Sequence, residues 1–202
     1  MKSLPRLYAI ADATFGDPVR LAANLFDAGA RLVQVRNKKC SARELLDQVD
    51  RILSFAPSDA TVIVNDRADV ALIAGAGGLH LGQTDLPPIH ARRVLGRERV
   101  IGFSTHNLGQ AVEADSFPVD YVAVGPIFTT ATKENPDPVI GLDGLSRICQ
   151  AIRKPVVAIG GIKLANAGEV LAAGAASIAV ISDVLASPDV GLRVRNWLDA
   201  LS

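Results

Sequence analysis

Two acidic residues stand within four residues of the ends of short apolar runs in the middle of the chain. Asp66 follows Thr61–Val64, and Asp85 follows Gly78–Leu81. Such short runs of Val, Ile and Leu favour buried strands, and Ala68–Ala74 between them is long enough for about two turns of helix. If the strands are parallel neighbours, both carboxylates lie at one edge and repel each other. Because Mg²⁺ is typically held by one or two carboxylates plus substrate phosphates, the pair is a candidate magnesium site.

A purely structural interpretation of the same two residues is also open. Asp66 would cap the helix that follows it, and Asp85 would start a turn before Pro87-Pro88. The pair alone does not distinguish the two interpretations, so the elements around it must decide.

The remaining sequence predicts the elements that position these residues. Short apolar runs recur eight times, at Leu7–Ala11, Leu32–Val35, Thr61–Val64, Gly78–Leu81, Val100–Phe103, Tyr121–Val124, Val156–Ile159 and Ser177–Ile181. Helical patterns fill most intervals, at Val19–Ala28, from Ser41 with Glu44 in a capping box, at Ala68–Ala74, Leu108–Ala114, Leu142–Ile152, Asn166–Ala173 and Val190–Leu201. Such strands predict a parallel sheet buried on both faces. Eight units favour a (β/α)₈ TIM barrel, with residues 1–202 forming a single catalytic domain.

The composition limits the classes of partner. The 202 residues are 49 % hydrophobic, and 21 basic residues balance 21 acidic ones. This balance argues against nucleic acid or an anionic membrane as a partner. Cys40 and Cys149 form no metal or disulfide spacing, no apolar run reaches the ~18 residues of a membrane helix, and the N-terminus lacks a signal-peptide core. We therefore expect a cytoplasmic protein, and a homo-oligomer remains open.

Further polar residues fall at the strand ends, where barrels of this kind build their active sites. Gln34, Arg36 and Lys38 alternate along the second strand and therefore point to one side. His80 lies within an apolar run, so we interpret it as a hydrogen-bonded core residue rather than a ligand. His106 could act as an acid or base, but beside a helix start a structural role is favoured.

Two other stretches suit phosphate binding. Gly161 ends the seventh strand and Ser182 follows the eighth, and the loops after these strands are the frequent phosphate site of such barrels. The long segment Phe128–Ile140 carries hydroxyls and Lys133, which suits a loop that covers a bound anion. We expect Thr129–Asn135 to form this lid.

The combination of motifs resembles the thiamine phosphate synthase family over nearly the whole chain. The matching motifs are Gln34-x-Arg36-x-Lys38, Asn65-Asp66-Arg67-x-Asp69, His80-Leu81-Gly82-Gln83-x-Asp85-Leu86, Gly102-x-Ser104-x-His106, Gly125-Pro126-Ile127-Phe128-x-Thr130-x-Thr132-Lys133, Ala158-Ile159-Gly160-Gly161-Ile162 and Val180-Ile181-Ser182. Each motif alone is modest, but their joint order and spacing are specific. The chain departs from the family at Asn37, where Glu is common, and at Thr129, where Pro is common.

The resemblance implies an activity and a set of roles. The family joins 4-amino-2-methyl-5-(diphosphomethyl)pyrimidine to 4-methyl-5-(2-phosphoethyl)thiazole, or to its carboxylated precursor, and releases thiamine phosphate and pyrophosphate. By matching position, the implied roles are Mg²⁺ binding by Asp66 and Asp85, diphosphate contacts from Arg36, Lys38, Asn65 and Lys133, pyrimidine contacts from Gln34 and Ser104, and thiazole phosphate contacts from Thr130, Thr132, Gly161, Ile181 and Ser182. Arg36, Lys38 and Lys133 are the implied catalytic cations.

The strand ends offer no Ser-His-Asp or Cys-His set, so we expect a Mg²⁺-assisted dissociative substitution that stabilises the departing pyrophosphate. Two rival functions remain. A related thiazole tautomerase should need neither the paired carboxylates nor Lys133. A non-catalytic barrel that binds thiazole phosphate should keep the phosphate site and lose the metal site.

Overall fold

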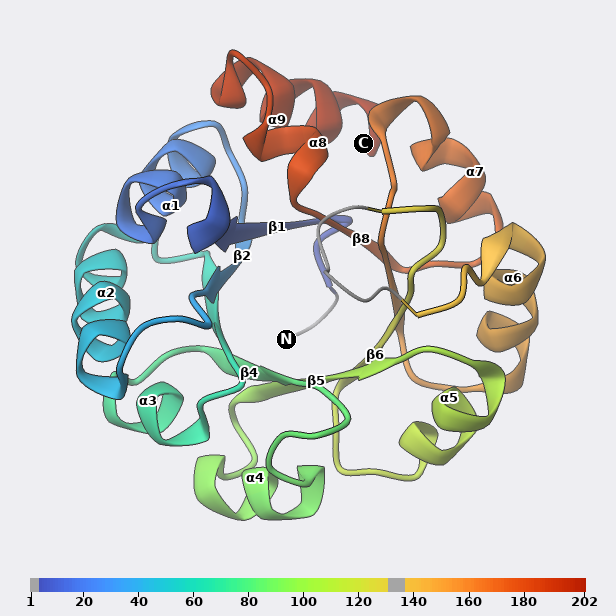
Figure 1. Cartoon of the computed structure of the whole chain (residues 1–202), viewed down its shortest axis with the longest axis horizontal. Helices are drawn as coiled ribbons and strands as arrows, with labels where there is room; N and C mark the ends of the chain where they lie inside the picture. Colours follow the sequence, from blue (N-terminus) through green and yellow to red (C-terminus); the bar gives the residue numbers. More distant parts are fainter. Residues whose placement is uncertain (1–3, 131–136) are drawn as a thin grey trace.

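Eight parallel strands form one closed barrel in the computed structural model, which describes residues 4–130 and 137–202. Each strand pairs in parallel with the next, and β1 pairs with β8 to close the barrel, as Figure 1 shows from one end. The strands are β1 Leu7–Asp12, β2 Leu32–Arg36, β3 Thr61–Asn65, β4 Gly78–Leu81, β5 Val100–Thr105, β6 Tyr121–Val124, β7 Val156–Ile159 and β8 Ser177–Val180. The predicted (β/α)₈ barrel and all eight predicted strands are confirmed.

Helices surround the barrel as an outer ring (Figure 1). They are α1 Pro18–Asp27, α2 Ala42–Phe55, α3 Ala68–Ile73, α4 Pro88–Leu95, α5 Leu108–Asp115, α6 Gly141–Ala151, α7 Ala167–Ala172, α8 Ser182–Leu185 and α9 Val190–Ala200, with 3₁₀ turns η1 Ala13–Phe15 and η2 Leu164–Asn166. The helix α4 was not predicted, because Pro87-Pro88 indicates a turn. The structure places Pro88 in the first turn of α4, where a missing N–H costs no helical bond.

Capping side chains fix where several helices start. Ser41 and Glu44 form the predicted capping box at the start of α2. Asn107 Oδ1 accepts a hydrogen bond from the Gln110 backbone N–H at 2.9 Å, which begins α5 directly after β5. These caps stop the chain from extending the strands, so polar residues at the strand ends stay at the rim.

Two separate apolar clusters fill the molecule. The larger one lies between strands and helices, where Trp197 of α9 is fully buried. The smaller one lies inside the barrel and contains Tyr8, Ile63 and Tyr121. The barrel is therefore a packed core closed beneath the rim, with buried polar groups among its interior side chains. In the described part of the chain, no helix has the length and apolar character needed to cross a membrane.

Candidate active site

The structure brings Asp66 and Asp85 together at the carboxyl-terminal rim. Their carboxyl groups lie within hydrogen-bonding reach of each other, and Asp85 Oδ2 accepts the Gly82 backbone N–H at 2.6 Å. Burial raises the pKa of Asp85, and the neighbouring Asp66 raises it further, although the Gly82 N–H opposes both effects. The half-exposed Lys38 compensates this like charge only in part, so a bound cation would relieve the remaining repulsion.

The structural interpretation of Asp66 as a helix cap is wrong. Arg67 occupies the cap position of α3, and its side chain makes no capping hydrogen bond to that helix. Asp66 instead has a φ of +63°, and it is the one non-glycine residue with positive φ in residues 4–130 and 137–202. A non-glycine residue in this region is strained, and such strain is common at functional sites. Asp85 does belong to a turn, but it closes the turn through its bonds with Gly82 and does not start one.

Two of the predicted cations, Lys38 and Arg36, form ion pairs with carboxylates. Lys38 Nζ lies 3.1 Å from Asp66 Oδ2, with about half of its side chain exposed. Arg36 Nη1 donates to Asp12 Oδ2, and Asp12 is 1 % exposed at the end of β1. Asp12 was missed by sequence reasoning, although it also directly follows an apolar run. The buried Asn65 ends β3 and pairs in register with His80 of β4.

Inside the barrel, Gln34 and Ser104 are linked through other side chains. Gln34 is 3 % exposed, and its Nε2 donates to Tyr8 Oη at 2.8 Å. Tyr8 Oη lies 2.9 Å from Tyr121 Oη, which lies 2.9 Å from His80 Nδ1. His80 Nε2 lies 2.8 Å from Ser104 Oγ. The prediction that Gln34 points into the barrel is confirmed.

His80 is the hydrogen-bonded core histidine that the sequence predicted. Both of its ring nitrogens have side-chain partners, and its ring stacks on Tyr121 with centroids 5.7 Å apart. Burial lowers the pKa of His80 to about 4, although Asp85 partly opposes that effect. His80 is therefore neutral at pH 7. Desolvation likewise raises the pKa of both Tyr8 and Tyr121, so their hydroxyls keep their protons.

His106 has structural partners at the end of β5. Its Nδ1 lies 2.7 Å from the Gly125 carbonyl and 3.4 Å from Asp137 Oδ2, and its backbone N–H donates to Gln110 Oε1 at 2.7 Å. These contacts agree with the favoured structural interpretation, because they tie β5 to the β6 end and to the start of α5.

A second pocket opens over the ends of β7 and β8. Its volume is about 420 Å³, and it is lined by Thr129, Thr130, Gly161, Ile162, Lys163, Ser182, Asp183, Ala186, Ser187 and Arg193. Three of the residues assigned to phosphate therefore meet there, and Ile181 stands just before α8 as its cap residue. Gly161 has a φ of +67°, and a Cβ there would lie 2.5 Å from the Thr129 carbonyl oxygen. Only glycine allows the two loops to approach this closely.

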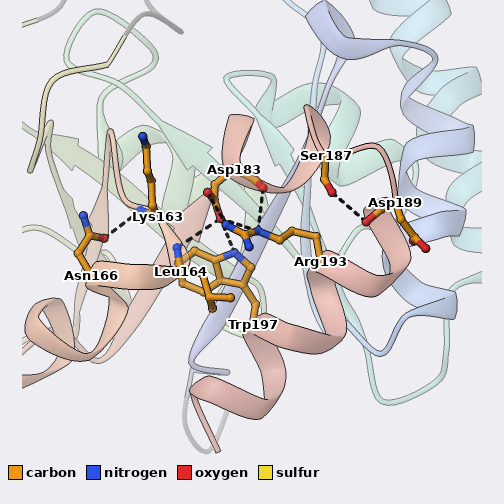
Figure 2. A network of polar contacts seen from close by, with 8 residues as sticks. All are labelled: Lys163, Leu164, Asn166, Asp183, Ser187, Asp189, Arg193 and Trp197. Carbon is orange, nitrogen blue, oxygen red and sulfur yellow. Dashed lines mark hydrogen bonds and ion pairs between the residues drawn. The ribbon is translucent and has the colours of Figure 1, made fainter.

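Asp183 lines this pocket and lies at the centre of a network of polar contacts, which Figure 2 shows. Its carboxylate accepts hydrogen bonds from Arg193 at 2.8 and 3.1 Å, from Trp197 Nε1 at 2.8 Å and from the Leu164 N–H at 3.3 Å. Asp183, Arg193 and Lys163 were missed by sequence reasoning. Their helix patterns gave no signal that α8, α9 and η2 meet at the phosphate loops.

Some predicted residues are not placed. Thr132, Lys133 and most of the proposed lid Thr129–Asn135 lie outside the described residues, so the lid stays a prediction. At the position where the family commonly has Glu, Asn37 Nδ2 donates to Gln48 Oε1 at 3.3 Å and Asn37 Oδ1 accepts the Lys39 N–H at 3.3 Å. This asparagine thus holds the loop between β2 and α2.

The fold and the rim residues together define a (β/α)₈ barrel with a cluster of acidic and basic side chains on one side and a pocket of about 420 Å³ on the other. Residues 7–184 match the family described as thiamine monophosphate synthase. The chain therefore belongs to the thiamine monophosphate synthase family, and it is a transferase like its relatives that are named thiamine-phosphate synthase.

Individual relatives agree with this membership. A thiamine-phosphate synthase of Koribacter versatilis is 49 % identical over 92 % of this chain and 91 % of its own length. One of Chloroflexus aurantiacus is 43 % identical over 95 % of this chain and 90 % of its own. The solved structure of a thiamine phosphate pyrophosphorylase from Pyrococcus furiosus superposes with a TM-score of 0.89 at 35 % identity, covering 97 % of this chain and 95 % of that one.

Proposed function

We propose that residues 1–202 act as one catalytic domain that joins 4-amino-2-methyl-5-(diphosphomethyl)pyrimidine to 4-methyl-5-(2-phosphoethyl)thiazole, or to its carboxylated precursor. The products are thiamine phosphate and pyrophosphate. The observation that supports the proposal is that two separate groups of polar side chains, both containing cations, lie on one rim. A cluster of carboxylates and cations ends β2 to β4, and a separate pocket ends β7 and β8. A coupling reaction between a diphosphate and a monophosphate needs both.

Asp66 and Asp85 fit a magnesium ion. Their carboxyl groups are adjacent, and the raised pKa of Asp85 reflects burial and its neighbour's charge. Among the described residues, no group of three or more His, Cys, Asp or Glu forms an all-protein cage. Two carboxylates with the remaining ligands from substrate phosphate and water are typical of Mg²⁺. When bound, the ion would neutralise negative charge on the diphosphate.

The cations beside this pair suit the diphosphate. We assign Arg36, Lys38, Asn65 and Lys133 to it. Lys38 directly neighbours Asp66, so a diphosphate held by both the ion and Lys38 would lie between two positive charges. Arg36 is oriented by the buried Asp12, which fixes the direction of its guanidinium group toward the rim.

The thiazole phosphate fits the second pocket. We assign its phosphate to Thr130, Thr132, Gly161, Ile181 and Ser182. Lys163 and Arg193 line the same pocket and make its floor less acidic than Asp183 alone would.

The chemistry needs charge stabilisation more than proton transfer. The thiazole nitrogen attacks with a lone pair and carries no proton, so the step requires no general base. The methylene carbon–oxygen bond breaks, its electron pair leaves with pyrophosphate, and a carbon–nitrogen bond forms. We propose a dissociative order, in which the aminopyrimidine delocalises positive charge before the new bond forms. Lys133 would contribute to stabilising the leaving group, and losing one such contact costs ~10²–10³ in rate by analogy with an oxyanion donor.

The two rival functions predict different results. A thiazole tautomerase would isomerise the thiazole phosphate alone, and a non-catalytic barrel would bind it without turnover. The adjacency of Asp66 and Asp85 favours the synthase, because neither rival needs a divalent cation at that point.

The test is to mix purified protein, both substrates and Mg²⁺ and to measure thiamine phosphate by its fluorescent oxidation product. We expect product that disappears with chelator, returns with Mg²⁺, and falls at least ~10²-fold in Asp85→Asn. Product that is unchanged in chelator would contradict the metal site. Isomerised thiazole phosphate without coupling would support the tautomerase.

A further inference from the structure

Five buried or half-buried side chains form a continuous hydrogen-bonded relay across the barrel interior. In order they are Gln34 of β2, Tyr8 of β1, Tyr121 of β6, His80 of β4 and Ser104 of β5. All four links are 2.8 or 2.9 Å long. The two ends of the relay are the residues to which the family resemblance assigns pyrimidine contacts, whereas its three middle members have no assigned role.

The direction of every bond in the relay follows from one bond at its end. Gln34 Nε2 donates to Tyr8 Oη, so the single proton of Tyr8 is available for Tyr121. Tyr121 then donates its own proton to His80 Nδ1. A neutral His80 with an unprotonated Nδ1 carries its proton on Nε2 and donates it to Ser104 Oγ.

The opposite direction conflicts with this starting bond. If Tyr121 donated to Tyr8, the Tyr8 oxygen would accept from both sides and its own buried proton would need a third partner. Tyr8 is 1 % exposed, and an unpaired buried donor costs about 1–3 kcal/mol. Reversal is possible only if the Gln34 amide turns over and all four bonds change together.

We infer that this relay sets the hydrogen-bonding polarity of the substrate site and selects the amino-substituted edge of a pyrimidine. With the bonds ordered as above, Ser104 keeps its hydroxyl proton for a ligand and Gln34 keeps its carbonyl oxygen. The site therefore offers one donor and one acceptor. A ring nitrogen with a lone pair and an exocyclic amino group match them. This inference rests on the proposed function for the identity of the ligand.

The same polarity rejects the 4-oxo analogue of the pyrimidine. That analogue presents a carbonyl oxygen in place of the amino group and a protonated ring nitrogen in place of the lone pair. Its carbonyl would face the Gln34 oxygen, and its N–H would face the Ser104 donor. Sites that pair a specific polar group discriminate strongly, because the mismatched ligand leaves buried groups unpaired.

The packing of the aromatic rings holds the hydrogen-bonding groups of the relay in place. Tyr121 stacks on His80 and meets Tyr8 edge-on, with centroids 5.9 Å apart and planes 84° apart. Gly102 of β5 makes room for this ring, because a Cβ there would lie 1.9 Å from Tyr121 Cζ. Tyr8, Tyr121 and His80 are thus positioning residues, which act on the ligand through Gln34 and Ser104.

The first test reads the proton positions without any substrate. ¹⁵N NMR of the full-length protein should show His80 as the neutral tautomer protonated on Nε2. In Tyr121→Phe, which keeps the ring and removes the hydroxyl, Nδ1 loses its donor and we expect a mixture of tautomers. His90→Gln, at an exposed residue of α4, should remove one histidine signal and leave the His80 signal unchanged. A His80 protonated on Nδ1 in the wild-type protein would overturn the inference.

The second test measures discrimination. The ratio of kcat/KM for the aminopyrimidine diphosphate to that for its 4-oxo analogue should fall at least ~10-fold in Tyr121→Phe, while His90→Gln keeps the wild-type ratio. An unchanged ratio in Tyr121→Phe would overturn the role in specificity. Failure of the wild-type protein to couple either pyrimidine would instead reject the proposed function, and the tautomer measurement would still decide the direction of the relay.

Discussion

Gly102→Ala should destabilise the protein and disturb the substrate site at the same time. A Cβ at position 102 would lie 1.9 Å from Cζ and 2.3 Å from the hydroxyl oxygen of Tyr121. These are ring atoms of a fully buried side chain that stacks on His80, so Tyr121 cannot move aside freely. Overpacking of this kind costs about 1–3 kcal/mol, and we expect the upper end, ~3 kcal/mol. For a domain of this size that corresponds to a melting temperature lower by ~6–12 °C.

The matched control is Gly168→Ala in α7. A Cβ there meets nothing within 4 Å, and the residue lies inside a helix. Alanine should therefore stabilise the protein by ~0.4–1 kcal/mol, which raises the melting temperature by ~1–4 °C. Scanning calorimetry of the two variants should give shifts of opposite sign.

A second change tests the cause of the Gly102→Ala effect. Tyr121→Leu removes the ring atoms that the new Cβ would meet, so the double variant should lose less stability than the sum of the two single variants. A melting temperature for Gly102→Ala within ~1 °C of the wild type, or strictly additive losses, would refute this account of the barrel interior.

Substitutions at Asp66, Asp85 and Trp197 test the two sites at the rim and the side chains beneath them. Asp66→Gly keeps the positive φ but removes its strain, and it removes one charge of a like-charged pair together with a half-exposed ion pair to Lys38. Thermal stability should therefore stay equal or rise by up to ~1 kcal/mol while turnover falls at least ~10²-fold; a variant that keeps wild-type turnover would contradict the metal site. The raised pKa of Asp85 means that its ionised form destabilises the fold near pH 7 and that this penalty lessens as pH falls through the raised folded pKa. Chemical denaturation should therefore show a higher free energy of unfolding for Asp85→Asn than for the wild type near pH 7, and the difference should shrink as pH falls. A difference that grows in acid would contradict the raised pKa of Asp85. Trp197→Phe removes a donor to Asp183 beneath the phosphate pocket, so steady-state kinetics should show a several-fold higher KM for the thiazole phosphate with kcat nearly unchanged; a fall in kcat alone would place its effect elsewhere.

The barrel was predictable because its signals are local. Each strand is a short apolar run between helical patterns, and the structure moves the strand ends by at most two residues, as at Thr105. The helix α4 was missed because Pro87-Pro88 reads as a turn, although Pro88 begins a helix. The missed helix and the shifted strand ends leave the strand order intact.

The site was less predictable, because it depends on contacts between distant segments. Asp66 is a residue type that often caps helices, but in the structure Arg67 takes the cap position and Asp66 has a positive φ. The relay combines side chains from five strands, and Tyr8 and Tyr121 looked like ordinary apolar strand residues. Their hydroxyls meet only because the barrel closes and brings β1 and β6 together across its interior.

If both proposed anion sites serve one coupling reaction, thiamine phosphate and pyrophosphate form together and only when both substrates are present. The direct measurement is to quantify thiamine phosphate and pyrophosphate in the same reaction with both substrates and Mg²⁺, and again with either substrate omitted. We expect equal amounts of the two products, and neither product when the thiazole phosphate or the pyrimidine diphosphate is absent. Pyrophosphate released at the full rate without the thiazole phosphate, or no product with both substrates present, would contradict it.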